Sequence, residues 1–216
     1  MASERASGKG SFSISDQRVG ASEPPMTEPR QSKNSGRAGP HSGLSEPSAW
    51  VRRFAPYVPA GGPVLDLACG GGRHVRLFLE RGHPVTAVDL DLSGIADMIG
   101  RPGLEALEID LEDGRRFPLA GRRFAGVVVT NYLYRPLFPA LIAAVAPGGT
   151  LIYETFAKGN EAFGRPRRPA HLMNPGELLE AVRGQLRVRA YEDLIVEAPR
   201  PAAIQRICAV NETQDL

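Results

Sequence analysis

The sequence predicts a doubly wound α/β fold, in which a seven-stranded, mostly parallel sheet has helices on both faces. Three observations predict it. From about residue 48 onward, segments with the hydrophobic pattern of strands alternate with segments that have the spacing of helices. Several strand-like segments are continuous apolar runs, which are typical of parallel strands buried on both faces. The 216 residues, 42% of them hydrophobic, suffice for one ordinary domain with some chain left over.

The predicted elements begin with a short helix and continue with strands that alternate with helices. Ser48 can cap the first helix, which places Trp50 and Phe54 on one face and ends at Pro56. We expect Trp50 and Phe54 to pack against the sheet, with a lid over a bound ligand as the alternative. Seven segments are predicted as strands: residues 63–68, 85–89, 104–109, 124–130, 150–156, 186–196 and 203–210.

Helices are predicted between most of these strands. The helix after the fourth strand is expected to end at residues 147–149, Pro-Gly-Gly, and the last helix to begin with Asn174, Pro175 and Glu177 at its N-cap, N1 and N3 positions. Residues 110–123 have no helical spacing and predict an irregular crossover. The expected buried positions are Val75, Phe78, Leu79 and Gly82 after the first strand, Leu92, Ile95, Ala96 and Ile99 after the second, Phe138, Leu141, Ile142 and Val145 after the fourth, and Leu178, Leu179 and Val182 in the last helix.

Charge, hydropathy and cysteine content exclude several classes of protein. The formal net charge is +2, from 26 basic and 24 acidic residues, so no global field marks a nucleic-acid or membrane binder. The longest weakly interrupted apolar run, residues 137–146, is far shorter than the roughly 20 residues of a membrane span, and we expect no part of the chain to cross a bilayer. Two cysteines, Cys69 and Cys208, do not make a disulfide framework. They suggest a reducing compartment, so the expected location is the cytoplasm, and residues 1–10 lack the apolar region of a secretory signal.

Residues 1–46 are predicted to be a disordered tail, and residues 47–216 to form the folded domain. The tail is rich in Ser, Gly, Pro, Arg and Glu, and Phe12 is its only aromatic residue, so it cannot bury enough apolar surface to offset the entropy of ordering. Its six basic and five acidic residues nearly cancel, which argues against an RNA-binding arm.

A glycine-rich turn follows the first predicted strand, and acidic residues surround it in the expected fold. Gly70 and Gly72 allow a ligand to approach the backbone closely. Asp66 lies inside the first strand, while Asp89 and Asp110 end the second and third. A carboxylate at Asp66 would repel the pyrophosphate of a dinucleotide, whereas S-adenosylmethionine carries an ammonium and a sulfonium and no phosphate. The acids therefore favour S-adenosylmethionine as the ligand.

Three stretches of the sequence, residues 64–74, 85–91 and 108–112, resemble the class I S-adenosylmethionine-dependent methyltransferases. The resemblance extends from about Trp50 to Val210. Two later stretches, residues 130–138 and 153–161, are similar to a bacterial group that is described as tellurite-resistance-like and has no settled substrate. The resemblance implies a Rossmann-like sheet of the methyltransferase type, with S-adenosylmethionine as the cofactor.

The resemblance also implies which residues contact that cofactor. Asp66 and the glycines would hold the methionine part, and Asp89 the ribose hydroxyls. Asp110 would reach the adenine amino group, and Asn131 would face the sulfonium. The full implied set is Asp66, Ala68, Gly70, Gly72, Asp89, Leu90, Asp110, Leu111 and Asn131.

No catalytic residue is assigned from the sequence, because methyl transfer is an in-line displacement that chiefly needs alignment of the reactants. A general base is required only if the nucleophile carries a proton at neutral pH. The candidates for a base are Tyr132, Tyr134, Glu154 and His171, and those for acceptor binding are Tyr134, Arg135, Asn160 and Arg165. No metal site is predicted, because the four histidines have no metal-ligand spacing.

Three functions stay open at this point. The favoured one is a methyltransferase for a small acceptor, an anionic molecule being one option, over which residues 156–173 would close. The second is an RNA methyltransferase that uses Arg165, Arg167 and Arg168. The third is a non-catalytic protein that binds the cofactor. These three arginines, together with Arg135, also have a structural interpretation, as a solvated loop held by carboxylates. The oligomeric state is not predicted.

Overall fold

The computed structural model describes residues 46–212. The predicted tail, residues 1–46, therefore lies outside the described residues except for Glu46.

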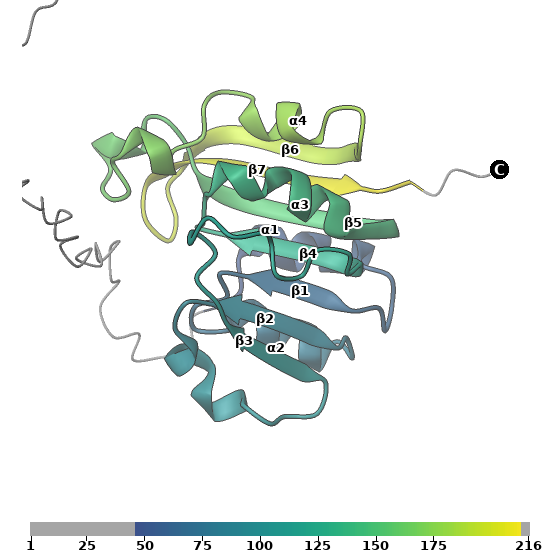
Figure 1. The fold of residues 1–216 in the computed structure, drawn as a ribbon. Coiled ribbons are helices and arrows are strands. Elements are labelled where there is room, and N and C mark those ends of the chain that lie inside the picture. The colour runs from purple at the N-terminus through teal and green to yellow at the C-terminus, as the bar shows by residue number, and fades with distance from the viewer. Residues whose placement is uncertain (1–45, 213–216) are drawn as a thin grey trace, which may run out of the picture. The chain divides into compact units, whose positions relative to one another are not determined.

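The described residues contain a seven-stranded sheet with the strand order β3-β2-β1-β4-β5-β7-β6 (Figure 1). Strand β7 is antiparallel to both of its neighbours, and the other pairs of neighbours are parallel. The doubly wound, mostly parallel sheet predicted from the sequence is thus confirmed. The strands are β1 (Val64–Leu67), β2 (Val85–Asp89), β3 (Leu104–Glu108), β4 (Phe124–Thr130), β5 (Val145–Phe156), β6 (Arg187–Val196) and β7 (Ala202–Val210).

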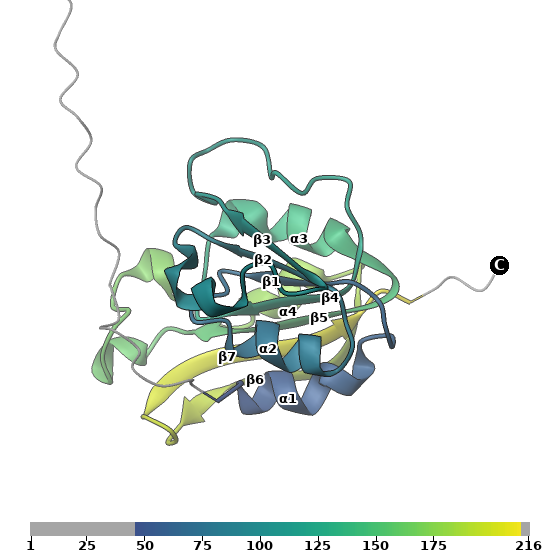
Figure 2. The ribbon, with the colours of Figure 1, turned by 90° about the horizontal axis from the view of Figure 1, so that it is seen from below.

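Helices cover both faces of this sheet (Figure 2). Helices α1 (Ala49–Phe54) and α2 (Arg73–Glu80) lie on one face, and α3 (Phe138–Ala144) and α4 (Glu177–Val182) on the other. Every residue of β1 and β4 is buried between these layers, which explains their continuous apolar sequences. Short 3₁₀ helices complete the described elements: η1 (Ala55–Tyr57), η2 (Leu92–Met98), η3 (Arg135–Leu137), η4 (Asn160–Ala162) and η5 (Pro169–His171).

Helix α1 forms as its sequence predicts. The Ser48 hydroxyl accepts hydrogen bonds from the backbone N–H groups of Trp50 (3.1 Å) and Val51 (3.4 Å). Trp50 is 2% exposed, and its indole N–H donates to the carbonyl of Ile207 on β7. Trp50 and Phe54 therefore pack against the sheet and do not form a lid.

The segment after β2 differs from the prediction, because η2 is a 3₁₀ helix and not an α-helix. Ile95 and Met98 are buried, whereas Ala96 is exposed and Ile99 is 54% exposed. A 3₁₀ helix has three residues per turn, so positions three apart face the sheet together. The predicted inward positions of Ala96 and Ile99 were wrong for this reason.

Strand β5 begins five residues before the predicted start, at Val145, which was expected to belong to the preceding helix. Val145 pairs with Phe124 of β4. The Gly148 N–H donates to the carbonyl of Asn211, and the Asn211 N–H donates to the carbonyl of Gly149. These bonds to the far end of the chain hold the Pro-Gly-Gly segment in the sheet.

The last helix begins at Glu177, two residues after the predicted first position at Pro175, because Gly176 has a left-handed backbone (φ +72°) and is the N-cap. The expected contact between Glu177 and Asn174 still forms. Oε2 of Glu177 accepts from the Asn174 backbone N–H at 2.7 Å and from its amide at 3.0 Å.

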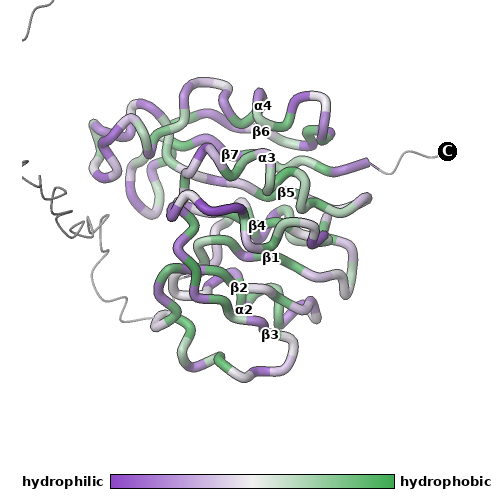
Figure 3. The backbone as a smooth tube through the Cα atoms, viewed as in Figure 1, coloured by the Kyte–Doolittle hydropathy of each residue, from purple (hydrophilic) through white to green (hydrophobic). Residues whose placement is uncertain are grey.

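The irregular crossover between β3 and β4 contains no helix, as predicted. Phe117 and Leu119 anchor it in the core, with 7% and 4% exposure. Figure 3 shows hydrophobic residues along the central strands and more hydrophilic ones in the loops at the left edge of the sheet. Among residues 46–212, no helix combines the length and the apolar character that a bilayer span requires.

Candidate functional site

The carboxyl ends of the parallel strands meet at one edge of the sheet, on the left in Figure 1. Strand β1 leads to β2 and β3 on one side, whereas β4 and β5 lie on its other side. The order of the strands therefore reverses between β1 and β4. Doubly wound sheets bind their ligands outside the carboxyl ends of the strands at such a point.

The turn from β1 into α2 is open above two of its glycines. A Cβ atom added to Gly70 or Gly71 would meet no atom within 4 Å. A Cβ atom on Gly72 would lie 2.4 Å from Cγ2 of Ile95, so Gly72 is required by packing. Gly70 and Gly72 have positive φ values of 51° and 70°, and so does Ala68, at 56°. A ligand can reach the backbone at Gly70 and Gly71, and α2 packs against η2 through Gly72.

The carboxylate of Asp89 is fixed beside this turn. Its Oδ2 accepts a hydrogen bond of 2.8 Å from the Gly70 backbone N–H. Its Oδ1 accepts one of 3.2 Å from the N–H of Asp91. Both bonds are on the surface, and each oxygen keeps capacity for a further donor from a ligand. Asp89 is half-buried.

Asp66 is a buried carboxyl group that lacks a full set of partners. The residue is 1% exposed, and its Oδ2 has no hydrogen-bond partner among the described residues. Burial raises the pKa of Asp66 to about 7, and the charge of Asp89 adds to the rise. The Arg73 guanidinium and the backbone N–H of Val75 oppose it. A buried carboxyl without a partner is costly, so this position is suited to a cationic or hydrogen-bonding ligand.

The other residues implied by the sequence resemblance lie on the loops at the same edge. Leu90, after β2, is 63% exposed. Asp110 follows β3 and is exposed, and its Oδ1 accepts from the Glu112 N–H at 2.8 Å. Asn131, directly after β4, has a φ of +54° and donates its backbone N–H to the carbonyl of Glu154 at 2.9 Å. Strained non-glycine residues of this kind are concentrated at functional sites.

Two tyrosines follow Asn131 and are half-buried. The carbonyl of Tyr132 accepts a hydrogen bond of 2.8 Å from the hydroxyl of Tyr153, which holds the segment onto β5. Burial raises the pKa of the Tyr132 phenol, and the nearby Glu112 carboxylate raises it further. A phenol with a raised pKa stays protonated at neutral pH, so Tyr132 is suited to donating a hydrogen bond.

Arg135 has protein partners for most of its guanidinium. Its Nε donates to Oε1 of Glu177 at 2.5 Å, and one terminal nitrogen donates to Oε2 at 2.8 Å. Two further bonds reach the carbonyls of Ala170 (2.9 Å) and Leu172 (2.8 Å). Arg135, expected from the sequence to bind an acceptor, thus joins η3 to α4 and to the long loop after β5.

Glu154 lies in a polar network on the α1 side of the sheet. Its Oε1 accepts from the Ser48 hydroxyl at 2.7 Å, and its Oε2 pairs with Arg206 at 3.2 Å. The Ser48 N–H donates to Nε2 of His74 at 3.1 Å. Burial lowers the pKa of His74 to about 3, with Arg73 contributing, so the ring is neutral and accepts this bond. The contacts of Ser48 with His74 and Glu154 were not predicted, because only the capping role of Ser48 is visible in the sequence.

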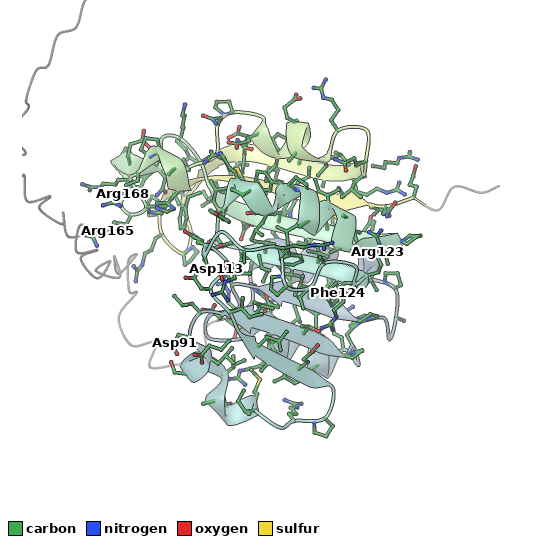
Figure 4. All side chains as sticks on the ribbon, in the orientation of Figure 1. Asp91, Asp113, Arg123, Phe124, Arg165 and Arg168 are labelled. Atoms are coloured by element: carbon green, nitrogen blue, oxygen red, sulfur yellow. The ribbon has the colours of Figure 1, made fainter. Side chains whose placement is uncertain are left out.

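The remaining expected acceptor residues are on the loop from 157 to 173. Asn160 is 2% exposed, and its side-chain amide donates to the carbonyl of Pro166 at 3.1 Å. His171 ends η5 and is half-buried. Arg165 and Arg168 are exposed and project from this loop away from the sheet (Figure 4).

The described part of the chain contains neither a group of side chains placed to bind a metal ion nor an activated cysteine. Within residues 46–212, no group of three or more His, Cys, Asp or Glu side chains is placed to hold a metal ion. Cys69 and Cys208 are buried free thiols. Burial raises the pKa of both, to about 12 for Cys208, so neither is an activated nucleophile.

Comparison with solved structures shows which proteins share this fold. TehB from Haemophilus influenzae matches with a TM-score of 0.60 and 17% identity, over 74% of this chain and 61% of that chain. An S-adenosylmethionine-dependent methyltransferase from Mesorhizobium loti matches with a TM-score of 0.57 and 18% identity, over 74% and 95%. The glycopeptide N-methyltransferase MtfA, complexed with S-adenosylhomocysteine, matches with a TM-score of 0.52 and 23% identity, over 74% and 88%. No family model matches the sequence, and no curated protein does so.

These likenesses establish the fold as that of the S-adenosylmethionine-dependent methyltransferases, TehB among them. The resemblance seen in the sequence is confirmed at that level. The chain spans 61% of the length of the TehB chain that it matches.

Proposed function

We propose that this protein is an S-adenosylmethionine-dependent methyltransferase that acts on a small, anionic acceptor. The observation that carries the proposal is the buried Asp66 carboxyl group, whose Oδ2 lacks a partner beside an open glycine turn. An ammonium group is the ligand chemistry that would satisfy this oxygen, either directly or through one water molecule. The methionine part of S-adenosylmethionine carries such a group, whereas the pyrophosphate of a dinucleotide would meet repulsion from an ionised Asp66. Asp89 does not discriminate between the two, because a carboxylate at the end of β2 suits the ribose hydroxyls of either ligand.

The residues around the turn fit the rest of this cofactor. Asp89 keeps acceptor capacity for the ribose hydroxyls, and the exposed side chain of Leu90 offers apolar contact to the adenine. Asp110 and Leu111 lie at the end of β3, where the adenine amino group would be held. Ala68 and Asn131 directly follow the two paired central strands β1 and β4, from where their backbones would face the sulfonium.

When bound, the cofactor supplies a methyl group on a sulfonium, which a nucleophile displaces in line. The work left to the chain is to align the acceptor with this methyl group and to exclude water. Asn131, Tyr132 and Tyr134 line the end of β4, from which they can position an acceptor. Tyr132 is protonated and would donate a hydrogen bond. Glu154 and His171 remain candidates for a base, although the Glu154 carboxylate is held by Ser48 and Arg206.

Calorimetry with the purified chain tests the cofactor. We expect S-adenosylmethionine and S-adenosylhomocysteine to bind, and NAD⁺ and FAD not to. Asp66→Asn should weaken binding of S-adenosylmethionine, while Glu80→Gln, a change to an exposed residue at the end of α2, should not. Binding of a dinucleotide in place of both sulfur compounds would overturn the proposal.

Transfer of a labelled methyl group tests the reaction. The protein is incubated with methyl-labelled S-adenosylmethionine and fractionated metabolites from cells. We expect the label in a small molecule that an anion-exchange resin retains. Cofactor binding without any labelled product would favour the non-catalytic alternative. Because both cysteines are free thiols, we also propose the cytoplasm as the location.

An RNA acceptor is the second candidate, and the exposed arginines favour it. None of Arg165, Arg167 and Arg168 is in an ion pair with a described residue. Labelled RNA as the product, together with RNA binding that falls steeply with salt, would select this function over the small acceptor.

A further inference from the structure

The loop from 157 to 173 is held in place by a set of specific contacts. Its two ends pair with each other, because the Lys158 N–H donates to the carbonyl of Met173 and the Met173 N–H donates to that of Phe156, both at 2.9 Å. The buried amide of Asn160 holds the carbonyl of Pro166. Arg135, fixed by Glu177, holds two carbonyls of the second half. The loop is therefore a built element that presents its tip in a defined position.

The loop from 157 to 173 is strongly basic, and we call residues 165–168, which hold three of its arginines, the basic tip. Between residues 157 and 173 there are four Lys and Arg side chains and a single carboxylate, Glu161. That carboxylate is exposed, and its Oε2 accepts a hydrogen bond from the Gly159 N–H at 2.9 Å. Lys158, Arg165, Arg167 and Arg168 are exposed, and none of them is in an ion pair within residues 46–212. Exposed, unneutralised arginines on a rigid support are suited to binding phosphate or carboxylate.

The basic tip and the acidic cofactor side are separated along the edge of the sheet. Figure 4 shows Asp91 at one end of this edge, Arg165 and Arg168 at the other, and Asp113 between them. Asp89, the last residue of β2, and Asp110, which follows β3, lie on the acidic side. A cation bound at the acidic side and an anion bound at the basic tip would each meet opposite charge.

We propose that the loop from 157 to 173 binds a phosphate or carboxylate group of the methyl acceptor, at a distance from the atom that is methylated. This inference rests on the proposed function and names the chemical class of its substrate. Arg165 and Arg168 provide the primary anion contacts, and Arg167 adds to the local charge. Phe163, which is 43% exposed on the same loop, offers an apolar surface to the part of the acceptor next to the anion.

The arginines that are free to bind an anion lie far from the end of β4, which separates the bound anion from the atom that is methylated. Arg135 lies nearest in sequence to the end of β4, but Glu177 and two loop carbonyls occupy its guanidinium. Arg165 and Arg168 project away from the sheet (Figure 4), so they reach outward from the central strands. An acceptor must therefore extend from the end of β4 to the loop. This geometry favours an acceptor longer than a simple anion.

The test compares two charge-matched double variants of the full chain. Arg165→Gln/Arg168→Gln removes the proposed anion contacts. Arg81→Gln/Arg101→Gln removes the same charge from exposed positions at the other edge of the sheet. Binding of pyrophosphate, of citrate and of a single-stranded RNA of about ten nucleotides is measured by calorimetry at two salt concentrations. Binding of S-adenosylhomocysteine is measured in parallel for every variant.

We expect the loop variant to bind pyrophosphate or citrate about tenfold more weakly than the wild type, and the control variant to bind them equally well. If RNA is the one probe that binds, and the loop variant binds RNA more weakly than the control variant does, the loop recognises phosphates of a polymer and not of a small molecule. Equal loss in both variants, or no binding of any of the three probes to the wild type, would overturn the inference. S-adenosylhomocysteine binding should be unchanged in both, and its absence from the wild type would refute the proposed function separately.

Discussion

The backbone N–H of Gly70 donates a hydrogen bond of 2.8 Å to Oδ2 of Asp89. This bond joins the turn after β1 to the end of β2, two segments that are 19 residues apart in the sequence. It holds the Asp89 carboxylate over the open face of the glycine turn. The same carboxylate can therefore fix the turn and accept hydrogen bonds from a bound ligand.

Replacement of Asp89 tests its place in the cofactor site. Asp89→Ala should weaken the binding of S-adenosylmethionine by about 1–3 kcal/mol, because hydrogen bonds to a charged group are lost. Asp89→Asn retains an oxygen for the Gly70 N–H and should show whether the charge itself matters. Calorimetry measures both, with Glu80→Ala as a surface control. An unchanged affinity of Asp89→Ala would remove Asp89 from the site.

The affinity for S-adenosylmethionine should depend on pH through Asp66. In the free protein, burial and Asp89 raise the pKa of Asp66 to about 7, with Arg73 and the Val75 N–H opposing them. The ammonium of the cofactor pairs with the ionised carboxylate, so binding must release a proton at lower pH. The dissociation constant should fall towards a plateau as the pH rises above about 7, and should approach a tenfold rise for each pH unit well below that value.

Asp66 should also make the free energy of unfolding of the free protein depend on pH, in a direction that its raised pKa fixes. Its folded-state pKa of about 7 lies above the ordinary value of 3.8, so the folded protein binds more protons than the unfolded chain between these values. The free energy of unfolding must then fall as the pH rises through this window. Asp66→Asn, which cannot ionise, should lack this fall and show a cofactor affinity that does not vary near pH 7. A variant with the wild-type pH dependence would exclude Asp66 as its source.

Gly70 and Gly72 are expected to respond differently to the addition of one methyl group. Gly72→Ala places a Cβ 2.4 Å from Ile95 and 2.7 Å from Met98, at a φ of +70°, and should reduce the free energy of unfolding by about 2 kcal/mol or more. The Cβ of Gly70→Ala meets no atom within 4 Å. Gly70→Ala should therefore cost only the strain of its backbone, about 1 kcal/mol, and mainly weaken cofactor binding. Urea denaturation and calorimetry separate the two effects, and similar losses of stability in both variants would contradict this assignment.

Much of the sheet could be predicted because its signals are local. Strands β1 and β4 are almost continuous apolar runs, and Asp66 and the glycines of the turn after β1 lie in one short stretch. The start of β5 could not be predicted, because Pro147 and the glycines after it have the local signature of a helix end. Their backbone bonds to Asn211 and the pairing of the flanking residues with β4 place them in the sheet. Local pattern and distant pairing conflict there, and the distant pairing prevails.

The site was predictable to the extent that strand ends define it. Asp66, Asp89 and Asp110 could be placed at one edge because parallel strands bring their carboxyl ends together. The Ser48–His74 contact joins residues 26 apart, and the Arg135–Glu177 pair joins residues 42 apart. No pattern in the sequence indicates either pair. They depend on how α1 and α4 pack on the sheet.

Ala68 occupies a position that favours glycine, which makes a stabilising substitution possible. Its φ of +56° costs an L-residue roughly 1–2 kcal/mol, while glycine loses about 0.5–1 kcal/mol through the entropy of the unfolded chain. Ala68→Gly should thus raise the free energy of unfolding by up to about 1 kcal/mol. Ala96→Gly on the exposed side of η2 should lower it instead. Urea denaturation of both variants measures the difference, and equal losses would show that Ala68 is not strained.

The Arg135–Glu177 pair should control how tightly the loop from 157 to 173 is held. Glu177→Gln removes the charge that fixes Arg135, which in turn holds the carbonyls of Ala170 and Leu172. Trypsin detects a loosened loop, because it cleaves after Lys and Arg in segments that unfold locally. Prolines follow Arg165 and Arg168, so the expected cleavage sites are Lys158 and Arg167.

We expect initial cleavage of Glu177→Gln at these two sites to be about three- to tenfold faster than in the wild type, as measured by mass spectrometry. Glu180→Gln is the matched control, since it lies on the same helix and breaks only an exposed pair with Arg183. Its cleavage rate should equal that of the wild type, because exposed pairs contribute little. Equal rates in all three proteins would mean that the paired ends of the loop and Asn160 suffice to hold it. Faster cleavage in Glu177→Gln alone would establish that a contact 42 residues away in sequence positions the basic tip.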